Sequence, residues 1–185
     1  MIVVAYYTKS YLSYVGNLIK SLNSFHIPYS IRCIEDQGSW QKNTQFKPRF
    51  ILGKMKQFHP QPIVYVDVDA IFMHYPMLFD QLNYDIGVHV LNHHPKKPEV
   101  KRNEMLSGTL YFGNTERSKV LVQRWIDECE KQPDVWDQKI LQQVIGSDFY
   151  NLPQEYCTIF DDLKQPAEPV IVHYQASRKV KSLRP

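Results

Sequence analysis

The sequence predicts an α/β fold in which helices flank a mostly parallel central sheet. Short β-prone apolar runs alternate with longer segments whose apolar residues recur at helical spacing, and this alternation is typical of strands joined by helical crossovers. One apolar run also ends in two acidic residues, at the end of a strand where ligands bind in open α/β sheets. A chain of 185 residues is long enough to bury one core, so a single domain covering residues 1–185 is expected.

The first third of the chain predicts two strands and two helices. Residues 2–7 form a continuous apolar run that indicates a buried strand. Residues 9–25 carry an apolar stripe at helical spacing, which consists of Tyr11, Val15, Leu18, Ile19 and Leu22. Residues 29–34 predict a second strand, and residues 48–58 predict a second helix.

The following segments continue the alternation. Residues 63–66 are a β-prone run that leads to the acidic pair, and residues 86–90 and 106–112 predict two further strands. Two helices are expected at residues 116–131 and 135–145. The second of them has apolar residues at helical spacing, namely Ile140, Leu141, Val144 and Ile145.

The acidic pair consists of Asp67 and Asp69, which follow the strand predicted at residues 63–66. Alternate side chains of an extended chain share a face, so both carboxylates can point together while Val68 turns into the core. Such a pair suits Mg²⁺ or Mn²⁺, which keeps several waters and completes its shell with substrate phosphate oxygens. The alternative interpretation is an exposed strand end with two solvated carboxylates.

Several short motifs follow the acidic pair in a fixed order. They are Leu106-Ser107-Gly108-Thr109-Leu110-Tyr111-Phe112, Trp136-Asp137-Gln138, Leu152-Pro153 with Tyr156-Cys157, and His173-Tyr174-Gln175 with Arg178 and Lys179. Together with Asp67-Val68-Asp69, this ordered set resembles the GT-A-fold glycosyltransferases, the nucleotide-diphospho-sugar transferases, over nearly the whole chain. The resemblance implies a GT-A fold and a divalent cation, Mn²⁺ or Mg²⁺. It also implies transfer of a sugar from a nucleotide-diphosphate donor, expected to be a UDP-sugar, to an acceptor hydroxyl.

Tyr7 and Thr8 lie where the first predicted strand ends, so they are expected to meet the nucleotide. The resemblance implies that Tyr7 stacks on the base and that Thr8 bonds the base edge or the ribose. A plain strand end followed by a turn is the alternative. The resemblance also implies a cation near the diphosphate, for which Lys47 and Arg49, at the start of a predicted helix, are candidates.

The glycogenin-like branch of these enzymes supplies expectations for the metal. The resemblance implies that Asp67 contacts the ribose or the metal, that Asp69 contacts the metal, and that His173 is the third ligand. Arg178 or Lys179 would then contact the diphosphate. The chain departs from that branch because it lacks the glycine and the Lys-Pro-Trp ending of the motif. A structural histidine at a strand end is the alternative for His173.

Two motifs are candidates for contacts with the donor sugar. Ser107 and Gly108 place a hydroxyl beside a position where a sugar can approach the backbone closely, although a β-bulge is the alternative. Asp137 and Gln138 lie in the first turn of a predicted helix and are expected to project toward the sugar. Asp137 is a candidate for recognition of a sugar hydroxyl or for the base of an inverting reaction. An acidic residue at a helix start also has a structural explanation in the helix dipole.

Composition narrows the class of protein. The formal net charge of +3 is too small to indicate a nucleic-acid partner. Three widely separated cysteines predict reduced thiols, not a disulfide framework. The N-terminal apolar run is too short for a signal peptide, and no run approaches the length of a membrane span, so a cytoplasmic protein is expected.

The acceptor stays open between a glycan, a protein side chain, a metabolite and a modified nucleic-acid base. The last option rests on a polar segment whose cations, Lys96, Lys97, Lys101 and Arg102, also fit a solvated surface loop. A haloacid-dehalogenase-type phosphatase is a rival, because it too has an Asp-x-Asp after an apolar strand and later acidic residues such as Asp161 and Asp162. A non-catalytic nucleotide-sugar-binding module is the third alternative.

Overall fold

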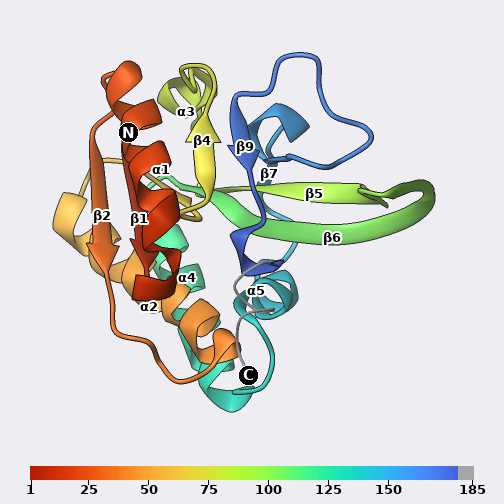
Figure 1. Ribbon diagram of the computed structural model, residues 1–185. Helices are drawn as coiled ribbons and strands as arrows, with labels where there is room; N and C mark the ends of the chain where they lie inside the picture. Colours follow the sequence, from red (N-terminus) through yellow and green to blue (C-terminus); the bar gives the residue numbers. More distant parts are fainter. Residues whose placement is uncertain (179–185) are drawn as a thin grey trace.

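The computed structural model describes residues 1–178 of the chain and contains a central sheet with helices on both faces (Figure 1). Within these residues the sheet has six strands in the order β2-β1-β3-β6-β5-β7. The strands are β1 (Ile2–Tyr7), β2 (Tyr29–Cys33), β3 (Ile63–Val66), β5 (Ile86–His94), β6 (Lys97–Phe112) and β7 (Tyr150–Asn151).

The predicted α/β fold with a mostly parallel sheet is confirmed. β1 pairs in parallel with β2 and β3, and β5 pairs in parallel with β7. β6 is the exception, because it runs antiparallel to both β3 and β5. The carboxyl ends of β1 and β3 therefore lie at the same edge of the sheet, beside the segment where β6 begins its pairing with β3.

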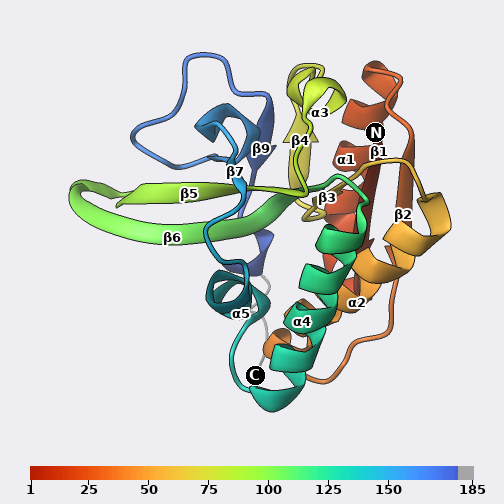
Figure 2. The same ribbon diagram turned by 180° about the vertical axis from the view of Figure 1, so that it is seen from behind.

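Side-chain alternation along the strands divides the core into two halves. Val3 and Ala5 of β1 pack on the face covered by α1 (Leu12–Ser24), whereas Val4 and Tyr6 pack on the opposite face. That opposite face is covered by α2 (Trp40–Phe58), α4 (Glu116–Lys131) and α5 (Asp137–Val144). Figure 1 shows α1 in front of the sheet. Figure 2, which views the molecule from the opposite side, shows α4 in front of the sheet.

The helix predicted at residues 48–58 begins earlier than expected, at Trp40, so Pro48 lies inside it. Proline lacks the N–H that would continue the helical hydrogen bonds, and a prediction that avoids interior proline misses the first half of α2. Tertiary contact supports the helix there, because the Tyr6 hydroxyl donates to the Asn43 carbonyl oxygen at 2.6 Å. The start at Trp40 places Lys47 in the middle of α2.

The helix predicted at residues 9–25 is divided into a 3-10 turn, Lys9–Tyr11, and α1. The helix predicted at residues 116–131 is confirmed as α4, and the one at residues 135–145 is slightly shorter, as α5. Three short elements were not predicted: α3 (Leu78–Gln81), a 3-10 turn at Gln154–Tyr156, and β7. None of them has a long enough periodic run to be recognised in the sequence.

A second sheet, also not predicted, joins distant parts of the chain. β4 (Ala70–Phe72) pairs antiparallel with β9 (Ile171–His173), and β9 pairs in parallel with β8 (Thr158–Ile159). The register sets His173 opposite Ala70. This pairing brings the late histidine to the residue that directly follows Asp69.

β5 and β6 form a long hairpin, which is longer than the two predicted strands. The cations of the polar segment are exposed, as expected for a surface segment, and Lys96 lies in the turn between the two strands. The expected loop is wrong for residues 97–102, which are part of β6, with His94 opposite Lys97 and His93 opposite Lys101. Figures 1 and 2 show the hairpin projecting from the sheet. Local polarity predicted a loop, whereas continued cross-strand pairing makes residues 97–102 a strand.

The structure also bears on the cysteine and membrane expectations. The three cysteines are free, with Cys33 exposed and with Cys129 and Cys157 buried. Among residues 1–178, no helix combines the length and the apolar character that crossing a membrane requires.

Candidate functional site

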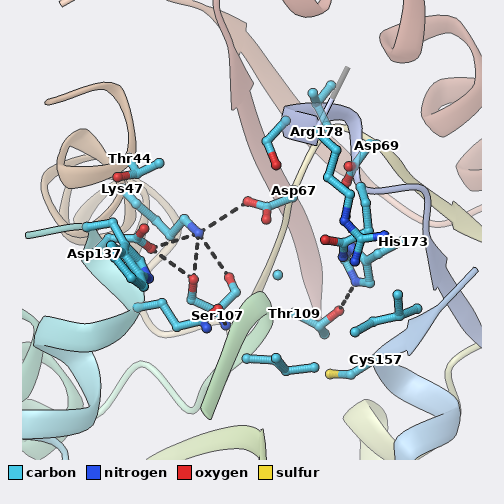
Figure 3. A pocket seen from close by; sticks show the side chains of 18 of the residues that line it. Thr44, Lys47, Asp67, Asp69, Ser107, Thr109, Asp137, Cys157, His173 and Arg178 are labelled. Carbon is cyan, nitrogen blue, oxygen red and sulfur yellow. Dashed lines mark hydrogen bonds and ion pairs between the residues drawn. The ribbon is translucent and has the colours of Figure 1, made fainter. Parts of the chain in front are cut away.

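The predicted site residues meet in one cavity of about 620 Å³, which lies at the carboxyl ends of β1 and β3 and continues along the hairpin. All but one of the described candidates line it: Tyr7, Thr8, Lys47, Asp67, Asp69, Ser107, Gly108, Asp137, Gln138, His173 and Arg178. The exception is Arg49, and Lys179 lies outside the described residues. Figure 3 shows Lys47 and Asp137 on one side of Asp67, with Asp69 and His173 on the other.

Asp67 directly follows β3 and is held by residues of β3 and β6. Its N–H donates to the Gly108 carbonyl oxygen at 2.8 Å, and the Tyr65 hydroxyl donates to its Oδ1 at 2.9 Å. The side chain remains 42% exposed. Burial raises the pKa of the Asp67 carboxyl above its usual range, and the charge on Lys47 only partly opposes this.

Asp69 has different surroundings. The Ala176 N–H donates to its Oδ2 at 2.6 Å, and its Oδ1 lies 3.7 Å from Nδ1 of His173. Burial alone would raise the pKa of Asp69, but the interactions with His173 and Ala176 outweigh it and lower this pKa. The surroundings of Asp69 therefore favour the ionised form of its carboxyl group.

His173 ends β9 and is 5% exposed. Its Nε2 and the Thr109 hydroxyl are 2.8 Å apart, while Nδ1 is on the side of Asp69. A side chain at Gly108 would meet the ring, because an added Cβ would lie 3.2 Å from the imidazole and 3.5 Å from Oδ2 of Asp67. Glycine at this position therefore keeps open a space that borders both His173 and Asp67.

Lys47 lies at the centre of a buried polar cluster and is only 3% exposed. Its Nζ donates to the carbonyl oxygen and Oγ of Ser107 at 3.1 and 3.0 Å, and lies 3.2 Å from Asp67 and 2.9 Å from Asp137. Burial alone would lower the pKa of Lys47, but the two carboxylates raise it. The lysine is thus a fixed cation that joins α2, β6 and α5.

Arg49, the other candidate cation from the same segment, points elsewhere. It pairs with Glu130 of α4 on the exposed surface, and it is not among the residues that line the cavity. Helical spacing explains the difference, since positions two apart on a helix do not share a face. The expectation of a cation near the diphosphate from Arg49 is therefore not supported.

Asp137 and Gln138 open α5 and face the hairpin. Oδ2 of Asp137, which is 3% exposed, accepts from the Ser107 hydroxyl at 2.9 Å. The Gln138 side chain accepts from the Ser107 N–H at 3.1 Å and donates to Oε1 of Glu104 at 2.8 Å. Both side chains therefore connect α5 to β6 through hydrogen bonds, and both also line the cavity.

The remaining candidates lie around the cavity mouth. Tyr7 is the last residue of β1 and Thr8 follows it, and Thr8 is buried, with its hydroxyl 2.9 Å from that of Ser10. Arg178 donates to Oδ2 of Asp161 at 2.7 Å. These residues surround the space between the first strand and the region after β9.

The cavity lining includes residues that sequence reasoning missed, chiefly aromatic and polar side chains. They include Tyr11, Trp40, Asn43, Thr44, Tyr65 and Glu104. Several come from the first half of α2, which the sequence did not predict as helix. A signal was present, because Ser39 caps this helix by accepting from the Lys42 N–H at 3.1 Å, and serine is a preferred N-cap residue.

The donor set can be tested against the expected divalent cation. Within residues 1–178, no three His, Cys, Asp or Glu side chains converge closely enough to hold a metal by themselves. Mg²⁺ and Mn²⁺ do not need such a cage, because they take one or two carboxylates and complete the shell with water and substrate phosphate. Asp67, Asp69 and the space preserved by Gly108 fit that requirement.

A family model described as nucleotide-diphospho-sugar transferase matches residues 61–181, more than half of the chain. A comparison with curated proteins finds no match. The family match includes the acidic pair, the Ser107 segment, the start of α5 and His173.

Solved glycosyltransferase structures share the fold. GlyE of Streptococcus pneumoniae TIGR4 has 18% identity and a TM-score of 0.63, with 94% of this chain and 54% of GlyE covered. A glycosyltransferase involved in glycosylation of the major capsid of PBCV-1 has 8% identity and a TM-score of 0.72, with 98% of each chain covered. The galactosyltransferase LgtC has 12% identity and a TM-score of 0.63, with 95% of this chain and 87% of LgtC covered. The chain thus spans about half the length of GlyE, and the GT-A fold expected from the sequence is confirmed.

Proposed function

The chain belongs to the nucleotide-diphospho-sugar transferase family, and from this premise we propose that it is a metal-dependent glycosyltransferase with a single domain over residues 1–185. It moves a sugar from a nucleotide-diphosphate sugar, with a UDP-sugar as the expected donor, to an acceptor hydroxyl. The observation that carries the proposal is the convergence of the motif residues, which come from separate helices and strands, in one cavity around Asp67.

In this proposal Asp67, Asp69 and His173 hold Mn²⁺ or Mg²⁺. The ion, when bound, neutralises the charge that develops on the departing nucleoside diphosphate. The contact between Thr109 and Nε2 of His173 supports the assignment, since a ligating histidine donates its other ring N–H to a partner and keeps one lone pair for the metal. The open space beside Gly108 supports it as well.

The first strand and the region after β9 bind the nucleotide in this proposal. Tyr7 stacks on the base, and Thr8 bonds the base edge or the ribose. Arg178 and Lys179 contact the diphosphate, where positive charge helps the leaving group depart. The pairing of Arg178 with Asp161 supports this role, because an exposed ion pair can exchange partners readily.

The sugar lies against β6 and the start of α5. Ser107 and Gly108 form the surface on which the sugar rests. Asp137 accepts hydrogen bonds from the sugar hydroxyls, and Gln138 accepts from them and donates to them. Lys47 acts through Asp137 and Ser107, because its fixed charge holds the Asp137 carboxylate in place beside Ser107. Asp137 is also the residue that would serve as base if the reaction inverts the anomeric centre.

The phosphatase alternative receives no support from the later acidic residues. Asp162 is paired with His93 at 2.9 Å, and Asp161 with Lys96 and Arg178. Neither lines the cavity that contains Asp67 and Asp69. A phosphatase that used Asp161 or Asp162 would need that residue beside Asp67.

The experiment is calorimetric titration of UDP-glucose, GDP-mannose and UDP into the protein, with Mn²⁺ and with EDTA. We expect one nucleotide to bind only in the presence of the metal, and its base identifies the donor. Absence of binding by all three, together with hydrolysis of a generic phosphate ester, would overturn the proposal in favour of the phosphatase.

Asp69→Asn provides the site-specific version of this test. An amide keeps an acceptor for the Ala176 N–H but removes the charge, so we expect metal-dependent binding to be lost while the thermal midpoint stays near that of the native protein. Asp127→Asn is the matched control, because Asp127 lies on α4 and bonds to Gln123 there. If the Asp69→Asn variant still binds the nucleotide, the assignment of Asp69 as a metal ligand is wrong.

A further inference from the structure

The cavity extends beyond the residues assigned above to the donor and the metal. Its continuation follows the hairpin and is lined by Leu91, His94, Pro95, Lys96, Arg102 and Glu104. These residues have no role in the proposed donor site. A transferase also needs a place for its acceptor, and this part of the cavity is contiguous with the sugar-binding surface.

One face of β6 leads outward from the centre of the site. Gly108, Leu106, Glu104 and Arg102 are alternate residues of this strand and all line the cavity, as expected for side chains on one face. At about 3.4 Å per residue, the row spans about 20 Å. Gly108, at its inner end, adjoins His173 and Asp67. A ligand on this face would therefore lie beside the donor sugar.

The outer end of the cavity carries two cations, Lys96 and Arg102. Lys96 lies 3.1 Å from Asp161, and Arg102 lies 2.8 Å from Glu104. Arg178, which the proposed donor site assigns to the diphosphate, also pairs with Asp161. The Lys96 side chain is 63% exposed, and exposed ion pairs contribute little stability. An incoming anion can therefore replace Asp161 as its partner.

The cations are accompanied by a neutral donor and by apolar surface. Nδ1 of His94 accepts from the Lys96 N–H at 3.1 Å, so the neutral ring carries its proton on Nε2, which can donate. Leu91 and Pro95 are buried yet line the cavity, and they offer apolar contact for the ring of a sugar. The face thus combines anion-binding groups with a surface for a carbohydrate.

We propose that this face of the β5–β6 hairpin is the acceptor subsite and that it selects an acceptor sugar bearing an anionic group, a carboxylate or a phosphate. Lys96 and Arg102 bind the anion at the outer end of the row, which directs the rest of the acceptor toward Gly108. The proposal rests on the proposed glycosyltransferase function, because an acceptor subsite has meaning only beside a donor. Its test nevertheless has a readout that does not depend on transfer.

The experiment is a titration of isotope-labelled protein with glucuronate, with glucose 6-phosphate and with glucose, followed by amide chemical shifts. We expect saturable shifts at residues 91–96 and 102–106 with at least one acid, and affinity at least about tenfold higher than for glucose, because charge-assisted hydrogen bonds are stronger than neutral ones. A response to glucuronate alone identifies a carboxylate, and one to glucose 6-phosphate alone identifies a phosphate. Equal affinity for glucose, or no saturable response to either acid, overturns the proposal.

The hairpin offers a matched pair of variants. Lys96→Gln combined with Arg102→Gln removes two charges from the cavity lining, and we expect it to weaken binding of the acid about tenfold. Lys97→Gln combined with Lys101→Gln removes two charges from the same hairpin outside that lining and should leave binding unchanged. Equal weakening in both variants would show general attraction by a basic hairpin, and would overturn the assignment of a subsite.

Failure of the subsite and failure of the proposed function are distinguishable. UDP-glucose, GDP-mannose and UDP are titrated separately with Mn²⁺ into the same native protein. Binding of one of these nucleotides without binding of either acid overturns only the subsite. Absence of binding by all three overturns the proposed function, and an anion response on the hairpin would then mark a site for a different ligand, so the acceptor assignment would fall as well.

Discussion

At the residue scale, Asp67 and Asp69 illustrate how two neighbouring carboxylates acquire different properties. Burial raises the pKa of Asp67 in spite of Lys47, whereas interactions with His173 and the Ala176 N–H lower the pKa of Asp69. The sequence presents the two as equivalent members of one motif. Their environments differ because Asp67 faces α2 and α5, while Asp69 faces β9 and the segment after it.

Lys47 supports a prediction about buried charge. Lys47→Met leaves Asp137 buried without its cation, and removal of one partner of a buried pair costs about 3 kcal/mol. We expect the free energy of unfolding, measured by urea denaturation, to fall by about this amount. The double variant Lys47→Met with Asp137→Asn should lose less, because it leaves no uncompensated charge.

Lys42→Met is the control for this prediction, since Lys42 is an exposed residue of the same helix. It should change the free energy of unfolding little. If Lys47→Met and Lys42→Met have the same effect, the buried cluster does not stabilise the fold.

At the element scale, the strand pairing between β4 and β9 and the early start of α2 decide the composition of the site. The first sets His173 opposite Ala70, and the second brings Trp40, Asn43 and Thr44 to the cavity. Neither the two short strands nor the start of α2 has a strong local signal in the sequence. β4 and β9 have three residues each within the described chain, and α2 contains an interior proline.

The start of α2 can be tested through its cap. Ser39→Ala removes the acceptor for the Lys42 N–H, and loss of an N-cap costs about 1 kcal/mol. We expect chemical denaturation to show this loss, whereas Ser24→Ala, which removes an exposed bond at the end of α1, should have a smaller effect. Equal losses would indicate that Ser39 does not act as a cap.

At the scale of the whole molecule, the cavity lies where the two apolar cores end. The cores occupy the two faces of the sheet, the cavity lies where β1 and β3 end, and Tyr6 and Tyr65 of one core also line the cavity. The later third of the chain then closes one side of the cavity through β9 and meets the hairpin. His89 of β5 takes part in this closure, because its Nδ1 is 2.7 Å from the Leu152 carbonyl oxygen.

His89 gives a prediction about stability and pH. Burial lowers its pKa below the ordinary value of 6.5, so the unfolded chain takes up a proton there before the folded one does. The free energy of unfolding should therefore decrease as the pH falls from about 7.5 to 5.5. His89→Asn, which keeps a side-chain donor, should reduce this slope in denaturation measured at each pH.

The control for this pH prediction is His26→Asn, because His26 is exposed and has a positive φ of 54° that asparagine tolerates. Its slope should match that of the native protein. A slope that is the same in His89→Asn and in the native protein would contradict the role of His89.

The sequence by itself determined the α/β class, the strand that leads to Asp67 and Asp69, and the order of motifs that identifies the family. These features depend on local periodicity and on short spacings, which the chain displays directly. Only the tertiary structure decided that Lys47 lies buried at the centre of a polar cluster, that His173 lies near Asp69, and that the polar segment after Lys96 is a strand from which Arg102 and Glu104 line the cavity. These outcomes depend on pairing between segments far apart in the chain, and such pairing is selected by packing and register across the whole fold, not by any local pattern.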